Sequence, residues 1–188
     1  MKQGEKTKRY ILEQSNTLFY ENGYAHTSFT DIMHATGLSK GNITYHFKNK
    51  RAILEGIIAQ RMEEIEVLFE EWESKTKEPI KRLDFFCNMI IKQEENIASF
   101  GCPMGTLTAE FSKNEPELYI LTIPMFTAYR RWLSKQFKEL NFEASDEKAM
   151  SFLSRVQGVA MVAHAFQDKE FLHHEMQKVK SELKEIAR

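Results

Sequence analysis

The chain has 188 residues, of which 42% are hydrophobic, and a formal net charge of −1 at pH 7. These values are typical of an ordinary globular protein with one or two domains. Apolar runs stay short of the roughly 18 residues that a membrane span needs, and the charged N-terminus differs from a signal peptide, so we expect a cytoplasmic protein without a membrane span. Cys87 and Cys102 are too few for a disulfide framework and fit a reducing compartment.

Charge is distributed unevenly along the chain. Residues 1–51 carry eight Lys and Arg against four Asp and Glu, whereas the remainder carries 18 against 23. An excess of basic residues is what contact with nucleic-acid phosphates requires. If the protein binds nucleic acid, the N-terminal quarter is therefore the expected contact region.

Helix is predicted along the whole chain. Four prolines and eight glycines interrupt it, and no segment alternates polar and apolar residues as a half-buried strand does. The first helix places Ile11, Leu18 and Phe19 on one stripe and stops at Gly23, a residue that tolerates left-handed backbone. The expected helices cover residues 5–21, 28–36, 39–47, 49–74, 79–97, 103–111, 116–140, 146–167 and 169–187.

The second and third of these helices are short and form a predicted helix-turn-helix. Ser28 and Asp31 have the spacing of a capping box, Gly37 suits a tight turn, and Ser39 caps the next helix. In such a motif the second helix enters the major groove of DNA and the first braces it. Four apolar residues have the spacing to lock the pair together: Ile32, Leu38, Ile43 and Phe47.

Polar side chains on the second helix of this motif are suited to DNA. Short amides and hydroxyls reach base edges, whereas long cations and hydroxyls serve phosphates. We expect base contacts from Asn42 and Thr44, and either kind of contact from Lys40. Ser39 completes this surface, and the remaining side chains are better placed for phosphates: Tyr45, His46, Lys48 and Lys50. A plain solvated polar face is the alternative interpretation.

These segments resemble the DNA-binding domain of the TetR family of transcriptional regulators. The resemblance rests on residues 19–24 (FYENGY), 27–32 (TSFTDI) and 35–50 (ATGLSKGNITYHFKNK), and it covers roughly residues 5–60. It departs from the family pattern at Met33, where a small alanine is usual, and at Thr44, where an aromatic residue is common. It implies that Lys40 and Asn42 lie near bases, and that four residues contact the DNA backbone: Thr27, Tyr45, His46 and Lys50.

The resemblance also implies an all-α fold with two domains. Residues 1–50 would form a three-helix helix-turn-helix domain, and residues 51–188 an effector-binding and dimerisation domain, with helix 51–74 connecting the two. The polar, proline-ended segment 75–79 independently indicates a boundary after that helix. The implied function is that of a repressor, without a cofactor, that a small molecule releases from a palindromic DNA operator.

The last two predicted helices carry a candidate homodimer interface. Residues 172–186 repeat apolar side chains at intervals of four and three, as a coiled-coil seam does, and residues 156–166 are apolar nearly all round. We expect a four-helix bundle with the same pair from a second chain. Internal packing of both stripes is the alternative. The expected interface residues are Val156, Val159, Ala163, Leu172, Met176, Val179, Leu183 and Ile186.

The middle helices are rich in aromatic residues and methionine, which favours a deformable apolar pocket for a hydrophobic or planar effector. Plain hydrophobic core is the alternative interpretation. The expected lining consists of Phe85, Phe86, Met89, Cys102, Met104, Phe111, Met125, Phe126, Tyr129 and Trp132.

Cys102 has distinctive chemistry because Pro103 follows it and suits a first helical position. Cys102 would then cap that helix, where the helix dipole favours the reactive thiolate. A thiol sensor of electrophiles and a small residue in a turn are both compatible with this pattern. Cys87, by contrast, is expected to be inert core.

Enzymatic chemistry is not expected. The sequence shows no Gly-rich phosphate loop, nucleophile-base set or metal-ligand spacing. His173 and His174 are adjacent, so on a helix they point about 100° apart and form no ligand pair. A helical interaction protein that lacks DNA binding remains as a second alternative.

Overall fold

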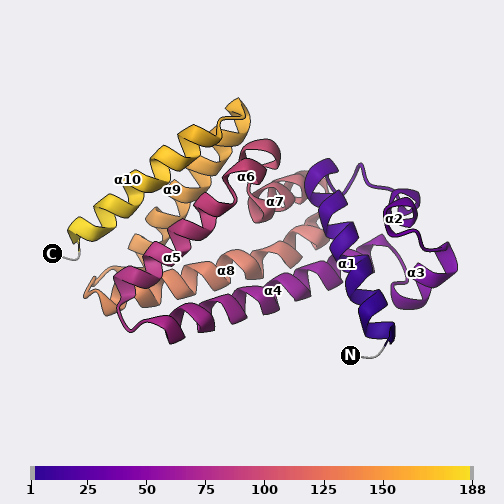
Figure 1. Ribbon diagram of the computed structural model, residues 1–188, viewed down its shortest axis with the longest axis horizontal. Helices are drawn as coiled ribbons and strands as arrows, with labels where there is room; N and C mark the ends of the chain where they lie inside the picture. Colours follow the sequence, from indigo (N-terminus) through magenta and orange to yellow (C-terminus); the bar gives the residue numbers. More distant parts are fainter. Residues whose placement is uncertain (1–2, 187–188) are drawn as a thin grey trace. The chain divides into compact units, whose positions relative to one another are not determined.

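The computed structural model describes residues 3–186, and this part of the chain is helical with no strand (Figure 1). The predicted all-α fold is confirmed. The helices are α1 (Gln3–Asn22), α2 (Phe29–Thr36), α3 (Lys40–His46), α4 (Lys50–Lys75), α5 (Pro79–Lys92), α6 (Glu94–Phe100), α7 (Pro103–Asn114), α8 (Pro116–Glu139), α9 (Ser145–Phe166) and α10 (Lys169–Ile186). Among the described residues, no helix is long and apolar enough to cross a bilayer.

One predicted helix is two helices in the structure. The expected helix over 79–97 ends at Lys92, and α6 starts at Glu94. Gln93 separates them with φ −104° and ψ 12°, and its N–H donates to the carbonyl of Ile90 at 3.1 Å. The break falls in a run of polar residues without proline or glycine, so the sequence carries no local signal for it.

The chain folds into two compact units that do not follow the division expected at residue 50. Unit 1 extends to Glu63 and also contains Leu107–Thr122, whereas unit 2 contains Glu64–Thr106 and the chain from Ile123 onward. Three helices, α4, α7 and α8, therefore begin in one unit and end in the other. In α8 the change of unit falls beside Pro124, which lacks the N–H that a helix interior needs.

Unit 1 is built around the contact of α1 with α2 and with the start of α4. Gly56 permits a close approach there, since a Cβ at this position would lie 2.8 Å from the Leu12 side chain and 3.1 Å from that of Phe47. The buried side chains of this unit include Ile11, Phe19, Tyr24, Ile32, Ile43, Ile53, Leu54 and Phe111.

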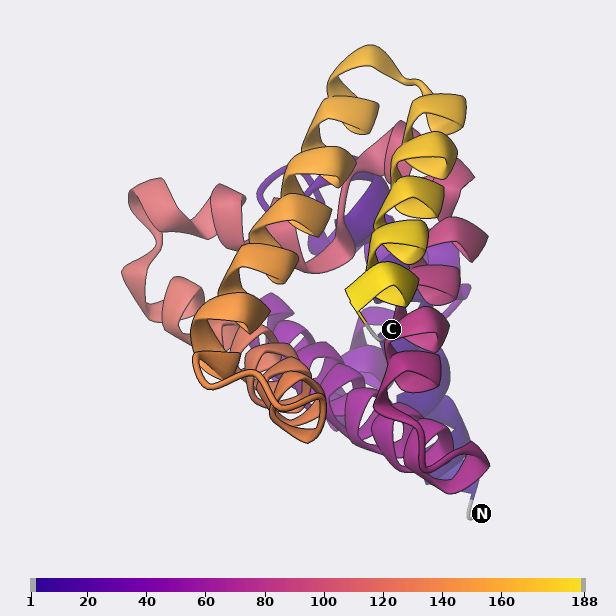
Figure 2. The same ribbon diagram turned by 90° about the vertical axis from the view of Figure 1, so that its left-hand side faces the viewer.

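Unit 2 contains α5, α6, α9 and α10. Helices α9 and α10 lie side by side, and α10 also packs against α5 and α6 (Figures 1 and 2). The apolar stripes of α9 and α10 enter this core, because Val156, Leu172, Met176 and Val179 are each at most 2% exposed. The two stripes therefore stabilise a single chain.

Candidate nucleic-acid interface

Side-chain caps define the start of α2. Ser28 has extended backbone, its hydroxyl accepts from the N–H of Asp31 at 3.2 Å, and the Asp31 carboxylate accepts from the N–H of Ser28 at 2.7 Å. The hydroxyl of Ser28 also donates to that carboxylate, and these hydrogen bonds lower the pKa of Asp31. The predicted capping box is present, so a helix of eight residues has a fixed first turn.

The turn between α2 and α3 follows the predicted chemistry. Gly37 adopts φ +66°, and its N–H donates to the carbonyl of Met33 at 2.9 Å. Ser39 then caps α3 by accepting from the N–H of Asn42 at 3.3 Å. Ile32 and Ile43 are fully buried, so α2 and α3 are locked together as the spacing predicted.

The opposite face of α3 is polar and exposed. Tyr45 is 83% exposed and contacts His46 edge to face, with ring centroids 5.0 Å apart. No heavy atom of its surroundings lies within 4 Å of a Cβ built at Gly41, so the backbone is open to a close approach there. The other exposed side chains of the predicted DNA-contacting set are Ser39, Lys40, Asn42, Thr44 and Lys48.

Thr44 has a local partner within this face. Its hydroxyl donates to the carbonyl of Lys40 at 2.9 Å. The hydroxyl oxygen still has acceptor capacity, and the methyl group remains available for apolar contact. Thr44 can therefore meet a base as an acceptor or through its methyl group.

Two residues of the predicted set are turned into the protein instead. Thr27 is 2% exposed, and its hydroxyl donates to the carbonyl of Gly23 at 2.8 Å. The ammonium of Lys50 donates to the carbonyls of Tyr24 and Thr27 at 2.8 and 2.9 Å, and burial lowers its pKa. Both side chains stabilise the loop between α1 and α2, so the structure gives them a role in holding the motif rather than a free phosphate contact.

Sequence reasoning missed a basic residue beside α3. Lys8 on α1 is exposed, and its ammonium lies 5.7 Å from the centre of the Phe47 ring just after α3. Gly4 also lies close to α3, since a Cβ there would be 3.9 Å from the His46 ring. The basic composition of the first nine residues was the available signal for this neighbour of the interface.

The predicted effector residues divide between the two units. Phe111 belongs to unit 1, where its ring meets that of Tyr24 edge to face at 5.3 Å. Phe85 lines a groove between α5 and α10 instead. The other expected residues lie in unit 2, where Phe86, Met125, Tyr129 and Trp132 are buried and Met89, Cys102, Met104 and Phe126 are half-buried.

An aromatic cluster forms around Trp132 in unit 2. The Trp132 ring stacks on Phe69 with centroids 4.8 Å apart and lies 5.2 Å from the Trp72 ring. Tyr129 contacts Phe69 at 5.2 Å, and burial raises its pKa, with a smaller contribution from the charge of Cys102. Phe69 and Trp72 come from α4, which the sequence treated as a connecting helix, so their part in this cluster was not predicted.

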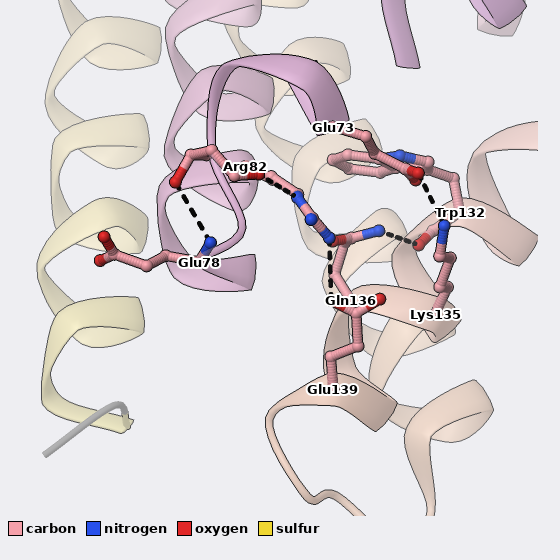
Figure 3. A network of polar contacts seen from close by, with 8 residues as sticks. Glu73, Glu78, Arg82, Trp132, Lys135, Gln136 and Glu139 are labelled. Atoms are coloured by element: carbon pink, nitrogen blue, oxygen red, sulfur yellow. Dashed lines mark hydrogen bonds and ion pairs between the residues drawn. The ribbon is translucent and has the colours of Figure 1, made fainter. Parts of the chain in front are cut away.

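A buried charged network lies beside this cluster (Figure 3). Arg82 is 5% exposed and donates to the side chains of Gln136 and Glu139 at 3.0 and 2.8 Å, and to the carbonyl of Thr76 at 3.0 Å. Gln136 in turn donates to the carbonyl of Trp132 at 3.3 Å. Because a buried arginine requires partners, this network fixes α5 against α8.

The predicted homodimer residues are covered within this chain. Val156, Val159, Ala163, Leu172, Met176, Val179 and Leu183 are all buried within this chain, and the side chain of Ile186 lies outside the described residues. Periodicity showed that one face of each helix is apolar, but it could not show which helices would cover that face. The seam of α10 is covered by α5, α6 and α9 of the same chain.

The outward face of α9 carries exposed apolar side chains. Phe166 is 78% exposed and Met161 is 71% exposed, and Met150 and Val162 are also exposed. Gly158 lies on the same face, with open space where a Cβ would be. This α9 face was missed because the helix is apolar nearly all round, which conceals which side is left uncovered.

The Cys87 thiol and the His173 imidazole are two further groups with reactive chemistry. Burial raises the pKa of the Cys87 thiol to about 12, which agrees with its prediction as inert core. His173 is half-buried, with Nδ1 2.7 Å from a carboxylate oxygen of Glu94. Within residues 3–186, no three His, Cys, Asp or Glu side chains are grouped so as to hold a metal ion.

Two capped short helices, a left-handed glycine turn and an exposed polar face on the second helix together define a helix-turn-helix DNA-binding protein. Residues 11–57 match the family model of the bacterial regulatory proteins, tetR family, so this part of the chain resembles the DNA-binding domain of those regulators. The predicted resemblance is confirmed. The match ends shortly after the start of α4.

Sequence similarity to other regulators extends beyond the DNA-binding domain. An HTH-type transcriptional regulator in the lacX 3′ region of Lactococcus lactis subsp. lactis is 22% identical, covering 96% of this chain and 95% of its own. The biofilm operon icaADBC negative regulator IcaR of Staphylococcus aureus is 27% identical over 108 residues, which are 57% of this chain and 58% of its own. A TetR-family regulator from Agrobacterium tumefaciens shares the fold, with a TM-score of 0.84 at 18% identity over 95% of this chain and 98% of its own.

Proposed function

We propose that this regulator is a homodimeric repressor that binds a palindromic duplex through α3 and is released by a small apolar molecule. The observation that carries the DNA part is the exposed polar face of α3 opposite the buried Ile43. IcaR, which is named as a negative regulator, supports repression as the direction of control. Two recognition helices about one DNA turn apart would read the two half-sites.

Within this face the chemistry assigns different contacts to neighbouring residues. Asn42 is exposed and has the amide that pairs with an adenine edge, while Lys40 reaches either a guanine edge or a phosphate. Tyr45 and Lys48 project far enough for phosphates. The open backbone at Gly41 lets α3 sit deep in the groove beside these side chains.

The test is selection of duplexes from a random pool by the full-length protein. Wild type should enrich a two-fold symmetric sequence, and Asn42→Ala should relax preference at one base position per half-site by roughly 1–3 kcal/mol. Gln177→Ala, which removes an exposed amide on α10, is the matched control and should select like wild type. Failure of wild type to enrich any duplex would favour a helical interaction protein without DNA binding.

The α9 face is the proposed dimer surface. From Met150 to Phe166 its exposed positions include Ser154, Gly158 and Met161, and the one charged side chain beside them, Arg155, is paired with Glu182 of α10. A monomer that exposed such an apolar stripe would be prone to association, and an isologous pair of these faces would cover it. The small residues Ser154 and Gly158 would let the two copies of α9 approach closely.

The aromatic cluster of unit 2 is the proposed effector region. Among the described residues, the buried indole N–H of Trp132 has no hydrogen-bond partner, which leaves it free to donate to a ligand. A planar apolar molecule with one acceptor would stack on the surrounding rings and satisfy this donor. Because α4, α7 and α8 each have one part in unit 2 and the other in unit 1, rearrangement of the cluster would be transmitted along these helices.

An electrophile captured by Cys102 is the competing effector chemistry. Cys102 is half-buried directly before α7, and its neighbours include Gly105. Operator affinity should be measured before and after treatment with N-ethylmaleimide for wild type and Cys102→Ser. We expect the same response from both, as reversible binding requires, whereas loss of DNA binding in wild type alone would establish the thiol sensor.

A further inference from the structure

Most backbone polar groups of the loop between α1 and α2 take part in hydrogen bonds. Gly23 opens the loop with φ +85°, and its carbonyl accepts from the Thr27 hydroxyl at 2.8 Å. The carbonyls of Tyr24 and Thr27 accept from the ammonium of Lys50. Ser28, the residue after Thr27, caps α2. The position of this loop therefore determines where the helix-turn-helix starts.

Glu110 on α7 binds two adjacent amides of this loop. Its carboxylate accepts from the N–H of Tyr24 at 3.0 Å and from the N–H of Ala25 at 2.6 Å, one oxygen for each. The same carboxylate lies 3.5 Å from the place of a Cβ at Gly23. Two charge-assisted hydrogen bonds from adjacent amides fix both the distance and the orientation of the loop relative to Glu110.

Phe111, the residue after Glu110, contacts the same part of the loop. The Phe111 ring is 1% exposed and meets the Tyr24 ring edge to face, while the Lys50 ammonium lies 4.1 Å from the centre of that ring. Consecutive residues of α7 thus bind the backbone and the ring of Tyr24. All of these groups belong to unit 1.

The helix that carries Glu110 does not begin in unit 1. Helix α7 starts at Pro103 in unit 2 and enters unit 1 at Leu107. We propose that Glu110 is a positioning residue for DNA binding: it sets the loop from which α2 and α3 follow, and through α7 it links that loop to unit 2. This inference rests on the proposed DNA-binding function and names the contact that controls it.

The test compares two substitutions that remove the same charge. Glu110→Gln keeps the side-chain length but places an amide donor against one of the two N–H groups. Glu115→Gln is the matched control, because the Glu115 carboxylate influences Tyr24 and Lys50 through its charge and no hydrogen bond joins it to the loop amides. Three quantities are measured for each full-length variant: affinity for the selected operator, affinity for a random duplex, and amide exchange of Tyr24 and Ala25 by NMR.

We expect Glu110→Gln to accelerate exchange at both amides and to weaken operator binding about tenfold, with little change on the random duplex. Glu115→Gln should resemble wild type in all three. Binding is compared at a temperature where circular dichroism shows every variant folded, so a purely structural role would leave operator affinity unchanged and overturn the proposal. Equal losses in both variants would also overturn it, since charge alone would then be responsible. A wild type that selects no operator would instead refute the DNA-binding function itself.

Discussion

The outward faces of α3 and α9 carry opposite chemistry. Each exposes an aromatic side chain, Tyr45 on α3 and Phe166 on α9. Around Tyr45 lie amide, hydroxyl and ammonium groups, whereas Phe166 is accompanied by Met161 and Val162. The neighbours of an exposed ring, rather than the ring itself, therefore indicate its partner: polar donors suit DNA, and a largely apolar face suits another protein surface.

The two helices also differ in what holds them in place. Helix α3 has seven residues and depends on the Ser39 cap and on the buried Ile43. Helix α9 has 22 residues and no side-chain cap at Ala144, and seven of its residues are buried. Short helices need local hydrogen bonds because they bury little surface, while a long helix is stabilised mainly by packing.

The largest expected effect separates the buried seam from the exposed α9 face. Val179→Glu should destabilise the protein by on the order of 4 kcal/mol, because Val179 is 2% exposed and a carboxylate there loses its hydration. Phe166→Glu should leave the chain folded and shift it from dimer to monomer. Urea unfolding followed by circular dichroism and sedimentation velocity measure the two outcomes.

Gln177→Glu is the control for the first substitution, since it adds the same charge to an exposed position of α10. It should unfold near the wild-type midpoint. If Val179→Glu were folded and monomeric while Phe166→Glu remained a dimer, the interface would lie on the α10 seam and the assignment of the α9 face would be wrong.

What the sequence could predict follows the same division. Ser28, Gly37 and Ser39 act through bonds to residues at most four positions away, so spacing alone located both short helices and their turn. The inward course of Lys50 was not predictable in this way, because its partners Tyr24 and Thr27 are more than 20 positions distant. A lysine near a helix start has the same appearance in the sequence whether it points to solvent or to a loop.

For a related reason, the sequence did not determine which elements bury the apolar side chains of unit 2. The repeat from Leu172 to Leu183 predicted an apolar seam correctly, but a seam covered by α5 and a seam covered by a second chain have the same periodicity. The joining of Phe111 to unit 1 is likewise a long-range event, since it depends on Tyr24. The sequence therefore predicted local features such as the apolar seam, but it did not predict which element covers that seam.

A smaller effect should distinguish two lysines at the edge of the helix-turn-helix. Lys50→Met removes two charge-assisted hydrogen bonds to loop carbonyls, so we expect a loss of stability of about 1–3 kcal/mol. Lys48 is exposed, so Lys48→Ala should leave stability within roughly 0.5 kcal/mol of wild type. Lys48→Ala should also lower the slope of log affinity against log salt by about one, as loss of one phosphate contact requires.

Urea unfolding and operator titrations at several salt concentrations measure these differences. The slope for Lys50→Met should equal that of wild type, because the ammonium is already bound to the protein. A slope reduced by about one in Lys50→Met would instead place Lys50 on a phosphate, as the sequence alone predicted.

The smallest effect concerns the capping box of α2, the local device that α9 lacks. Hydrogen bonds from Ser28 lower the pKa of Asp31 below its ordinary value of 3.8, so the carboxylate stabilises the folded state when it is ionised. This contribution is complete above pH 3.8 and is lost as the pH falls through the lower folded-state pKa. Asp31→Asn should therefore be less stable than wild type near pH 6, and the difference between the two should shrink as the pH falls below about 4. Urea midpoints across this range measure the difference.

In a Ser28→Ala background the pH dependence should be reduced but not abolished, because the side-chain hydroxyl is the larger of the two Ser28 contributions and the backbone N–H remains. A difference between wild type and Asp31→Asn that stays constant down to pH 3 would show that the cap acts through shape rather than charge.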